Sequence, residues 1–226
     1  IYRLFPAAGL SQIRELSRMG SYEDCLKMGE ANFNLVLNPE ARSAGEALLR
    51  RLDLPYIELT RSYEPAVIAR QYSLLGAAIG VTFHDEEYRA EAGEELERFR
   101  HSCRGLRLAI GQTVNANPFE LAAALAGSGC VPERIFASYS GADFPYIRTL
   151  AERAPAARLY TGISPTMAAW RPEGQVDLTI GRDAAWYYPQ APNVPFCEDR
   201  QPFGYRGLTA LLRRMAAGLG QEGGQL

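Results

Sequence analysis

The residues of this chain best placed for chemistry lie in short polar loops, each of which follows a predicted strand and precedes a predicted helix. The first loop runs from residue 111 to residue 118 and contains Thr113, Asn115 and Asn117. In an open α/β sheet such a loop faces the ligand crevice, and backbone N–H groups at a helix start can hold an anion. The loop has neither the glycine spacing of a dinucleotide fingerprint nor the lysine of a P-loop. We therefore interpret Asn117 first as a helix cap, and ligand contact as the second possibility.

The same arrangement recurs twice further along the chain. One loop contains Ser138 and Ser140 and ends at Asp143, and another contains Gly162 and Ser164. We expect Asp143 and Ser164 to cap the helices that follow them. Because the carboxyl ends of parallel strands meet at one edge of a sheet, the three loops are expected to form a crevice together. The candidate ligand-binding residues in these loops are Gly111, Thr113, Asn115, Asn117, Ser138, Ser140, Gly162 and Ser164.

Other residue types that carry chemistry show no recognisable pattern. His84 and His101 are the only histidines, and neither has a Ser, Cys or Asp partner at a spacing that indicates a hydrolytic triad. The cysteines form no C-x-x-C and have no metal-ligand spacing, which indicates reduced thiols buried as small apolar side chains. They are Cys25, Cys103, Cys130 and Cys197.

Aromatic residues gather near the predicted C-terminal crevice. They are Trp170, Trp186, Tyr187 and Tyr188. We expect them to pack in a core, and a stacking surface for a flat ligand is the alternative.

These loops require strands and helices that alternate along the chain. In the second half we expect strands over residues 106–111, 134–138, 158–161, 176–180 and 194–196, and helices over residues 118–126, 143–153, 164–170 and 207–219. In the first half we expect strands over residues 2–7, 33–37 and 54–59, and helices over residues 11–20 and 41–52. Two consecutive helices, over residues 64–80 and 85–103, follow the third of these strands.

This alternation predicts an α/β fold with two Rossmann-like, doubly wound parallel-sheet lobes joined by helices. We expect a partial Rossmann-like domain over residues 1–83, a connecting helix over residues 84–104 and a C-terminal Rossmann-like domain over residues 105–226.

The composition is that of an ordinary globular protein. The 226 residues are 47% hydrophobic and 22% charged, with a formal net charge of −2, which gives no reason to expect nucleic acid or an anionic membrane surface as a partner. No apolar run reaches the roughly 20 residues that span a bilayer, and there is no signal peptide pattern. We expect a cytoplasmic protein. Since the chain begins at Ile1, we also expect it to be a piece of a longer polypeptide.

The order of several short motifs resembles the nitrogenase component 1 type oxidoreductase family. A run from residue 34 to residue 39 leads through a helix to Leu54-Pro55-Tyr56-Ile57, which is similar to the family's "GIPY" strand. Near the end, the chain is similar to a family pattern of an Asp-led strand, a "GIP" strand and a "P-x-x-GY-x-G" motif that opens the last helix. The matching residues are Asp177, Asn193-Val194-Pro195-Phe196 and Gly204-Tyr205-Arg206-Gly207.

The resemblance covers most of residues 1–219 and implies a particular assembly. Family members have three doubly wound domains per subunit, so this chain would hold a partial middle domain and the last domain. They work as paired subunits that receive electrons from an ATP-driven iron–sulfur protein. The expected partners are therefore a sibling component 1 subunit and an ATP-dependent iron–sulfur reductase. The cysteines of the bridging cluster lie mostly in the first domain, so we expect this piece to bind no cluster and its parent protein to bind one.

The resemblance also points to two positions where the family places cofactor ligands. By rough alignment, Asn38 occupies the turn in which the nitrogenase catalytic subunit has a cysteine ligand, and asparagine cannot replace a thiolate at soft iron. We keep Asn38 as a candidate crevice residue. The loop from Cys197 to Phe203 lacks the family's cofactor histidine, which leaves Cys197 as the only candidate metal ligand there.

We therefore expect a fragment of a nitrogenase-like component 1 oxidoreductase subunit, serving as an electron-accepting reductase or as a metallocofactor scaffold, and inactive alone. The alternative is a two-lobed small-molecule or metal-cofactor binding protein without catalysis. A third possibility is a glycosyltransferase-like sheet domain, for which the sequence offers no specific donor-site residues.

Overall fold

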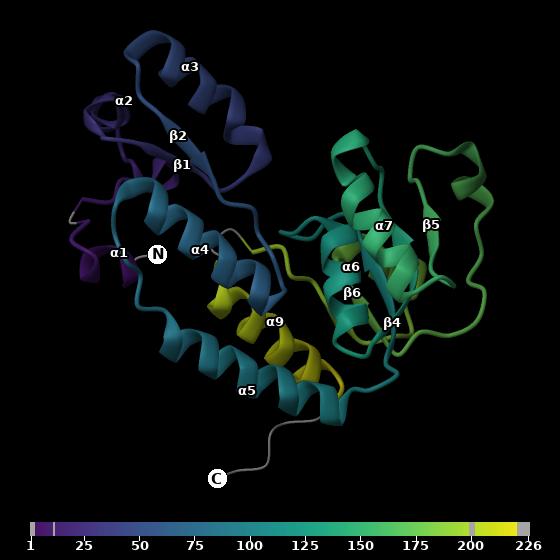
Figure 1. Ribbon diagram of the computed structural model, residues 1–226. Coiled ribbons are helices and arrows are strands. Elements are labelled where there is room, and N and C mark those ends of the chain that lie inside the picture. Colours follow the sequence, from purple (N-terminus) through teal and green to yellow (C-terminus); the bar gives the residue numbers. More distant parts are fainter. Residues whose placement is uncertain (1–2, 11, 199–201, 221–226) are drawn as a thin grey trace. The chain divides into compact units, whose positions relative to one another are not determined.

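Two separate parallel sheets organise the chain in the computed structural model, which describes residues 3–10, 12–198 and 202–220 (Figure 1). Each sheet belongs to its own compact unit. Unit 1 comprises Ile1–Arg61 and Ala69–Glu86, and unit 2 comprises Ser62–Ile68 and Glu87–Leu226. The parallel sheets and their helices confirm the expected α/β class. The domain boundaries given above stay a prediction.

Unit 1 is built on a two-stranded sheet with helices around it. Strand β1 (Asn34–Val36) pairs in parallel with β2 (Tyr56–Glu58), and α3 (Arg42–Leu52) connects them. This strand–helix–strand unit confirms the elements expected there. The remaining elements are α1 (Leu4–Ala7), η1 (Leu16–Arg18), α2 (Tyr22–Leu26), η2 (Lys27–Glu30), η3 (Pro39–Ala41) and most of α4 (Pro65–Ile79).

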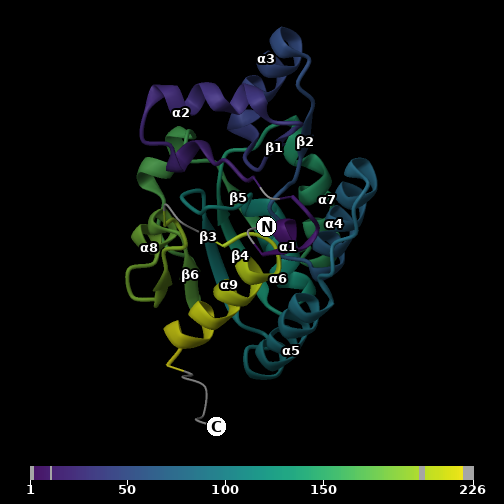
Figure 2. The same ribbon diagram turned by 90° about the vertical axis from the view of Figure 1, so that its left-hand side faces the viewer.

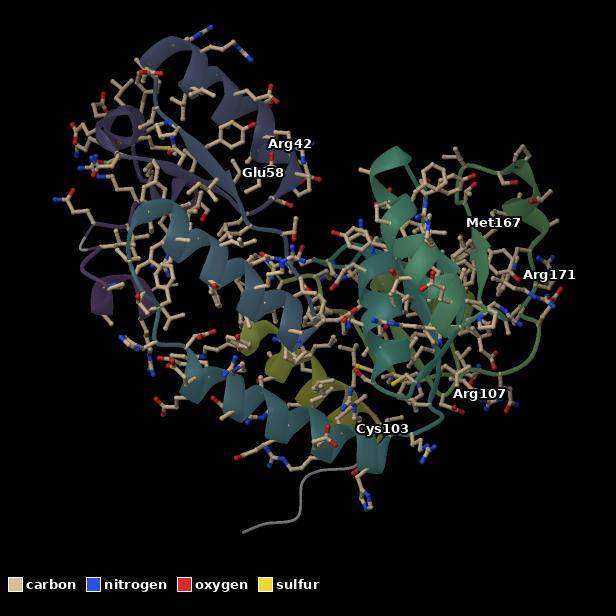
Figure 3. All side chains as sticks on the ribbon, in the orientation of Figure 1. Arg42, Glu58, Cys103, Arg107, Met167 and Arg171 are labelled. Carbon is tan, nitrogen blue, oxygen red and sulfur yellow. The ribbon has the colours of Figure 1, made fainter. Side chains whose placement is uncertain are left out.

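A bidentate ion pair fastens α3 to the second strand of unit 1. Arg42, at the start of α3, donates from Nε and Nη2 to the two carboxylate oxygens of Glu58 at 2.7 and 2.8 Å. Figure 3 shows the two side chains pointing toward each other. The hydrogen bond from Arg42 lowers the pKa of the Glu58 carboxyl. Because both side chains are substantially exposed, the pair orients the helix more than it stabilises the unit.

The strand expected over residues 2–7 is wrong for the residues that the structure describes. Leu4–Ala7 forms the short helix α1, in which the adjacent side chains of Leu4 and Phe5 are both buried. A half-buried strand would bury alternate residues instead. The Phe5 ring stacks on Phe83 with centroids 5.1 Å apart. Ser11, the expected cap of a helix over residues 11–20, lies outside the described residues, and only η1 forms within that range.

Unit 2 is built on a five-stranded parallel sheet with the strand order β5-β4-β3-β6-β7. All five strands of the second half were expected, although β4 begins three residues earlier, at Val131 instead of residue 134. The strands are β3 (Arg107–Gly111), β4 (Val131–Phe136), β5 (Arg158–Tyr160), β6 (Leu178–Ile180) and β7 (Asn193–Val194). The helices are most of α5 (Glu86–Ser102), then α6 (Pro118–Gly127), η4 (Gly141–Asp143), α7 (Phe144–Arg153), η5 (Pro165–Ala169), α8 (Arg182–Tyr187) and α9 (Tyr205–Gly218).

Helices cover both faces of this sheet, as a parallel sheet requires. Leu108, Ile110 and Leu178 point to one face and are 0% exposed. Figure 2 shows α6 and α7 on one side of the strands and α8 on the other. The face toward α8 carries Ala109 and Phe136, which pack with residues of η5 and α8. The doubly wound interior of unit 2 therefore has two apolar layers separated by the sheet.

Two motif residues named in the sequence analysis have structural roles in unit 2. Asp177 accepts hydrogen bonds from the backbone N–H and the guanidinium of Arg107, at 2.7 to 3.1 Å, and so joins the starts of β6 and β3. Gly207, in the first turn of α9, leaves room for the Pro202 carbonyl, because a Cβ at this position would lie 2.7 Å from that oxygen. Both residues serve the fold.

None of the helices formed by the described residues combines the length and the apolar character that crossing a membrane requires.

We predict that Ile110→Ala destabilises unit 2 by about 2–5 kcal/mol, because it removes a fully buried side chain from a packed layer. The matched control is Ile163→Ala, where the side chain is 84% exposed and the change should stay within about 0.5 kcal/mol. Urea unfolding followed by tryptophan fluorescence measures both, since Trp170 and Trp186 are the only tryptophans and both lie in unit 2. Equal stability of the two variants would contradict the placement of β3 at the centre of the sheet.

Candidate functional site

The candidate site lies where the strand order of unit 2 reverses. From β3 the chain proceeds outward to β4 and β5, and it then returns to place β6 on the other side of β3. Open α/β sheets bind ligands at the carboxyl ends of the strands, at such a switch point. Here the loop after β3, residues 112–117, lies next to the start of α8, which follows β6.

An internal carboxylate occupies this switch point. The side chain of Asp183, in the first turn of α8, accepts hydrogen bonds from the backbone N–H of Gln112 at 2.7 Å and from that of Thr113 at 3.2 Å. It also accepts from the Thr113 hydroxyl at 2.6 Å. These donors are the kind of groups that would hold a phosphate or carboxylate of a ligand. In this structure their hydrogen bonds go to the protein's own acid.

The Thr113 hydroxyl completes the connection in the opposite direction. Its oxygen accepts from the backbone N–H of Arg182 at 2.9 Å and from that of Asp183 at 3.3 Å. The loop after β3 and the first turn of α8 thus exchange hydrogen bonds in both directions. Two orphan N–H groups at the start of α8 find acceptors in this way.

Gly111 makes this arrangement possible. It is the last residue of β3, and a Cβ at this position would lie 1.9 Å from Oδ1 of Asp183. No side chain fits at that distance, so the carboxylate can reach the loop only over a glycine. Gly111 is therefore a close-approach residue, as in a ligand-binding loop, but the group that approaches it is Asp183.

A second polar cluster holds the loop after β4. Asn117 caps α6, as expected, because its Oδ1 accepts from the N–H groups of Phe119 and Glu120. Its Nδ2 donates to Asp143 at 2.6 Å. Asp143 was expected to cap α7, but its carboxylate instead accepts from the backbone N–H and hydroxyl of Ser140. Burial acts to raise the pKa of Asp143, but the hydrogen bonds from Ser140 and Asn117 outweigh it and lower that pKa.

Most of the other predicted residues also line this edge. Ser138 donates its backbone N–H to the side chain of Gln112 at 2.9 Å, and Asn115 donates its backbone N–H to the Phe196 carbonyl at 2.9 Å. Gly162 and Ser164 follow β5, the edge strand, and no described hydrogen bond joins them to the loop after β3. Ser164 makes no side-chain cap to η5, which corrects that expectation.

Asn38 is the one predicted residue that belongs to unit 1. It is exposed between β1 and η3 and makes no side-chain cap. Its role as a crevice residue stays a prediction, as does ligand binding by the residues of unit 2.

The aromatic residues near this edge pack mainly into unit 2. Phe136 stacks on Tyr187 with centroids 4.0 Å apart and on Tyr160 at 5.2 Å, and Trp170 meets Phe136 edge-on. This confirms core packing for Trp170, Tyr187 and Tyr188. Trp186 is different, because it is 75% exposed at the end of α8.

One open hollow lies in unit 1, and none of the predicted residues lines it. It is lined by Ile13, Arg14, Glu15, Arg18, Met19, Asp24 and Lys27. Its cations pair with carboxylates at 2.7 to 3.2 Å, as Arg14–Glu30, Arg18–Glu15 and Lys27–Asp24. Because these charges are balanced locally, the hollow offers no excess charge for an ionic ligand, and we assign it no function.

Comparisons with known proteins agree with this architecture. The family model described as nitrogenase component 1 type oxidoreductase matches residues 1–219. This chain belongs to that family. Its fold is similar to that of nitrogenase Cp1 at pH 6.5, with a TM-score of 0.71 at 18% sequence identity. The alignment covers 96% of this chain and 56% of that one, so the chain spans little more than half the length of the solved subunit. A search of curated proteins found no match.

Component 1 type proteins bind iron–sulfur clusters, so we tested whether the described residues fit one. No group of three or more His, Cys, Asp or Glu side chains that could hold a metal ion occurs within residues 3–10, 12–198 and 202–220. Cys103 and Cys130 are buried, and burial raises the pKa of Cys130 to about 12 and also raises that of Cys103. Metals bind the thiolate, which these two sites disfavour. The described residues therefore do not fit a complete cluster site, and we derive no step through one.

Asp183 is the site residue that the sequence analysis missed. The helix that carries it, α8, was not expected either, since the sequence predicted no helix between the last two strands. A signal was present: Gly181 ends a predicted strand, and an acid then stands where the first turn of a helix favours one. That signal predicts a local cap, whereas the carboxylate serves a loop about 70 residues earlier in the chain.

We predict that Gly111→Ala destabilises unit 2 by about 2–4 kcal/mol, because its Cβ would displace the Asp183 carboxylate and break the hydrogen bonds at the switch point. The matched control is Gly162→Ala, because a Cβ there meets nothing within 4 Å and the stability should change little. Urea unfolding by tryptophan fluorescence is again the measurement.

Asp183→Ala alone should lower the free energy of unfolding of unit 2 by about 1–3 kcal/mol, because it leaves two N–H groups and a hydroxyl without their acceptor. The Gly111→Ala, Asp183→Ala double variant should then lose clearly less than the sum of the two single changes, because the clash is gone. Strict additivity of the two costs would contradict the close approach.

Proposed function

We propose that this chain is part of a component 1 type subunit that acts, with a sibling subunit, as an electron-accepting reductase or as a metallocofactor scaffold. The observation that carries this proposal is the family match over residues 1–219. By the properties of the family, the electrons come from an ATP-dependent iron–sulfur protein. The residues of this chain supply two parallel-sheet units, and cluster ligands come at least partly from outside the described residues.

The geometry of the switch point supports a scaffold role over nucleotide binding. In a dinucleotide-binding lobe, the backbone N–H groups after the first strand hold the pyrophosphate. In unit 2 the corresponding donors, at Gln112 and Thr113, bond to Asp183. A phosphate would have to displace a carboxylate that is already hydrogen-bonded at 2.6 to 3.2 Å. The crevice edge therefore serves first to fasten the lobe together.

We predict that the chain, purified without oxygen and treated with iron and sulfide, retains iron well below one cluster per chain. The reason is that its described residues offer no complete set of ligands. Iron analysis after desalting is the measurement. Cys197→Ser tests the one candidate ligand and should leave the residual iron unchanged, with Cys25→Ser as the matched control on another partly buried thiol. A stoichiometric cluster that is lost in either serine variant would overturn this assignment of the ligands.

Assembly is tested separately from iron binding. The chain should form a defined complex with a component 1 homologue from the same source, detected by light scattering after size exclusion. In a thermal-shift screen, ATP and NAD should leave the melting temperature of the chain alone unchanged. A large shift with a single small ligand, together with no complex, would instead favour a two-lobed binding protein.

A further inference from the structure

The short connection that leads into α4 is fastened within unit 2 by a buried acid. Residues Ser62–Ile68 belong to unit 2, although the stretches before and after them in sequence belong to unit 1. Ser62 and Tyr63, at the start of this connection, are buried, with 4% and 2% of their surface exposed. The hydrogen bonds made by these two residues therefore determine whether the connection stays in place.

The anchor is Glu120, in the first turn of α6. Its Oε1 accepts a hydrogen bond from the Ser62 hydroxyl at 2.7 Å and another from the backbone N–H of Tyr63 at 3.0 Å. Ser62 is fixed further because its Oγ accepts from the backbone N–H of Glu64 at 3.2 Å. One carboxyl oxygen therefore holds two consecutive residues of the connection.

A second clamp lies beside the first and is much more exposed. Arg153, at the end of α7, donates to both carboxylate oxygens of Glu64 at 2.7 and 3.3 Å, and to the Ala123 carbonyl at 2.9 Å. The Glu64 and Arg153 side chains are about one-third exposed, at 31% and 34%. Solvent screens such a pair, so it holds the connection weakly. The buried clamp at Glu120 is the stronger of the two.

The other carboxyl oxygen of Glu120 is what makes this clamp sensitive to protons. Oε2 is buried and has no hydrogen-bond partner among the described residues. Water does not replace the missing partner easily, because Glu120 as a whole is only 5% exposed. An ionised carboxylate needs partners on both oxygens, and a buried one without them carries a large desolvation cost. The neutral acid keeps the two hydrogen bonds on Oε1 and avoids most of that cost.

We propose that Glu120 is a proton-operated latch: its neutral form holds the Ser62–Tyr63 connection on α6, and its ionised form releases it. Ionisation leaves Oε2 in need of water, and water reaches it only when the connection opens. The charged groups that face the latch are Glu64 on the connection and Arg153 on α7. They have opposite signs and largely offset each other, so burial dominates.

The direction of the pH dependence follows from linkage. Burial raises the pKa of Glu120 from 4.5 to about 7, against the hydrogen bonds from Ser62 and Tyr63, which lower it. A raised pKa means that the closed state binds the proton more tightly than the open state. The closed state is therefore fully favoured below the ordinary pKa of glutamate. It loses that advantage as the pH rises toward 7, and the loss is complete above it.

Hydrogen exchange of the full chain tests the latch. The measurement is the protection of the Tyr63 amide and of peptides spanning residues 60–68, corrected for intrinsic exchange, between pH 5.5 and pH 8.5. Protection in the natural sequence should fall about tenfold or more over this range. In Glu120→Gln, which mimics the neutral acid, it should stay constant. The matched control, the exposed Glu152→Gln on α7, should behave like the natural sequence.

A second variant keeps the test decisive if Glu120→Gln does not fold. Ser62→Ala removes a hydrogen bond that lowers the pKa of Glu120, so the midpoint of the loss of protection should move to higher pH. Constant protection in the natural sequence would overturn the latch. So would a pH dependence that persists unchanged in Glu120→Gln, or a midpoint that does not move in Ser62→Ala.

Discussion

Unit 2 depends on one constraint, which is that the backbone N–H groups after its central strand need acceptors at the edge of the sheet. β3 is buried between β4 and β6, so its chain emerges at the switch point with polar groups facing the neighbouring loop. Asp183 supplies the acceptor, and Gly111 leaves the space for it. The Thr113 hydroxyl donates to the Asp183 carboxylate and accepts from the backbone N–H of Arg182. These two hydrogen bonds fix the position of α8 relative to the loop after β3.

Acids in the first turn of a helix have three different roles in this unit. Asp143 closes a capping box with Ser140, the N-cap of η4, instead of capping α7 as expected. Asp183 and Glu120 occupy similar positions in α8 and α6, yet each accepts hydrogen bonds from a distant segment. The two acids differ in how many of their carboxyl oxygens accept hydrogen bonds. Both oxygens of Asp183 accept them, whereas only one oxygen of Glu120 does. Similar cap signals thus give a local cap, a fixed clamp and a latch.

The difference between local and long-range hydrogen bonds explains which features could be predicted from the sequence. Alternation of apolar runs and capping residues predicted the five strands of unit 2, the cap at Asn117 and the edge at which the loops gather. These are short-range properties. The partners of Asp183 and Glu120 lie about 60 or 70 residues away and depend on which strands are neighbours, so no local pattern could reveal them. The expected strand at the N-terminus failed for a related reason, since the burial of Leu4 and Phe5 depends on contacts such as that with Phe83.

The closed switch point also bears on how a component 1 type subunit could use a Rossmann-like lobe. A lobe that binds a nucleotide leaves its strand-end N–H groups open and gains their hydrogen bonds only when the ligand arrives. In unit 2 an internal acid has already satisfied these groups, so the lobe is organised without a ligand. Such a lobe is preorganised, because its strand-end hydrogen bonds are formed within the protein before any ligand arrives. The same fold therefore keeps its strand ends closed once one carboxylate takes the place of a phosphate.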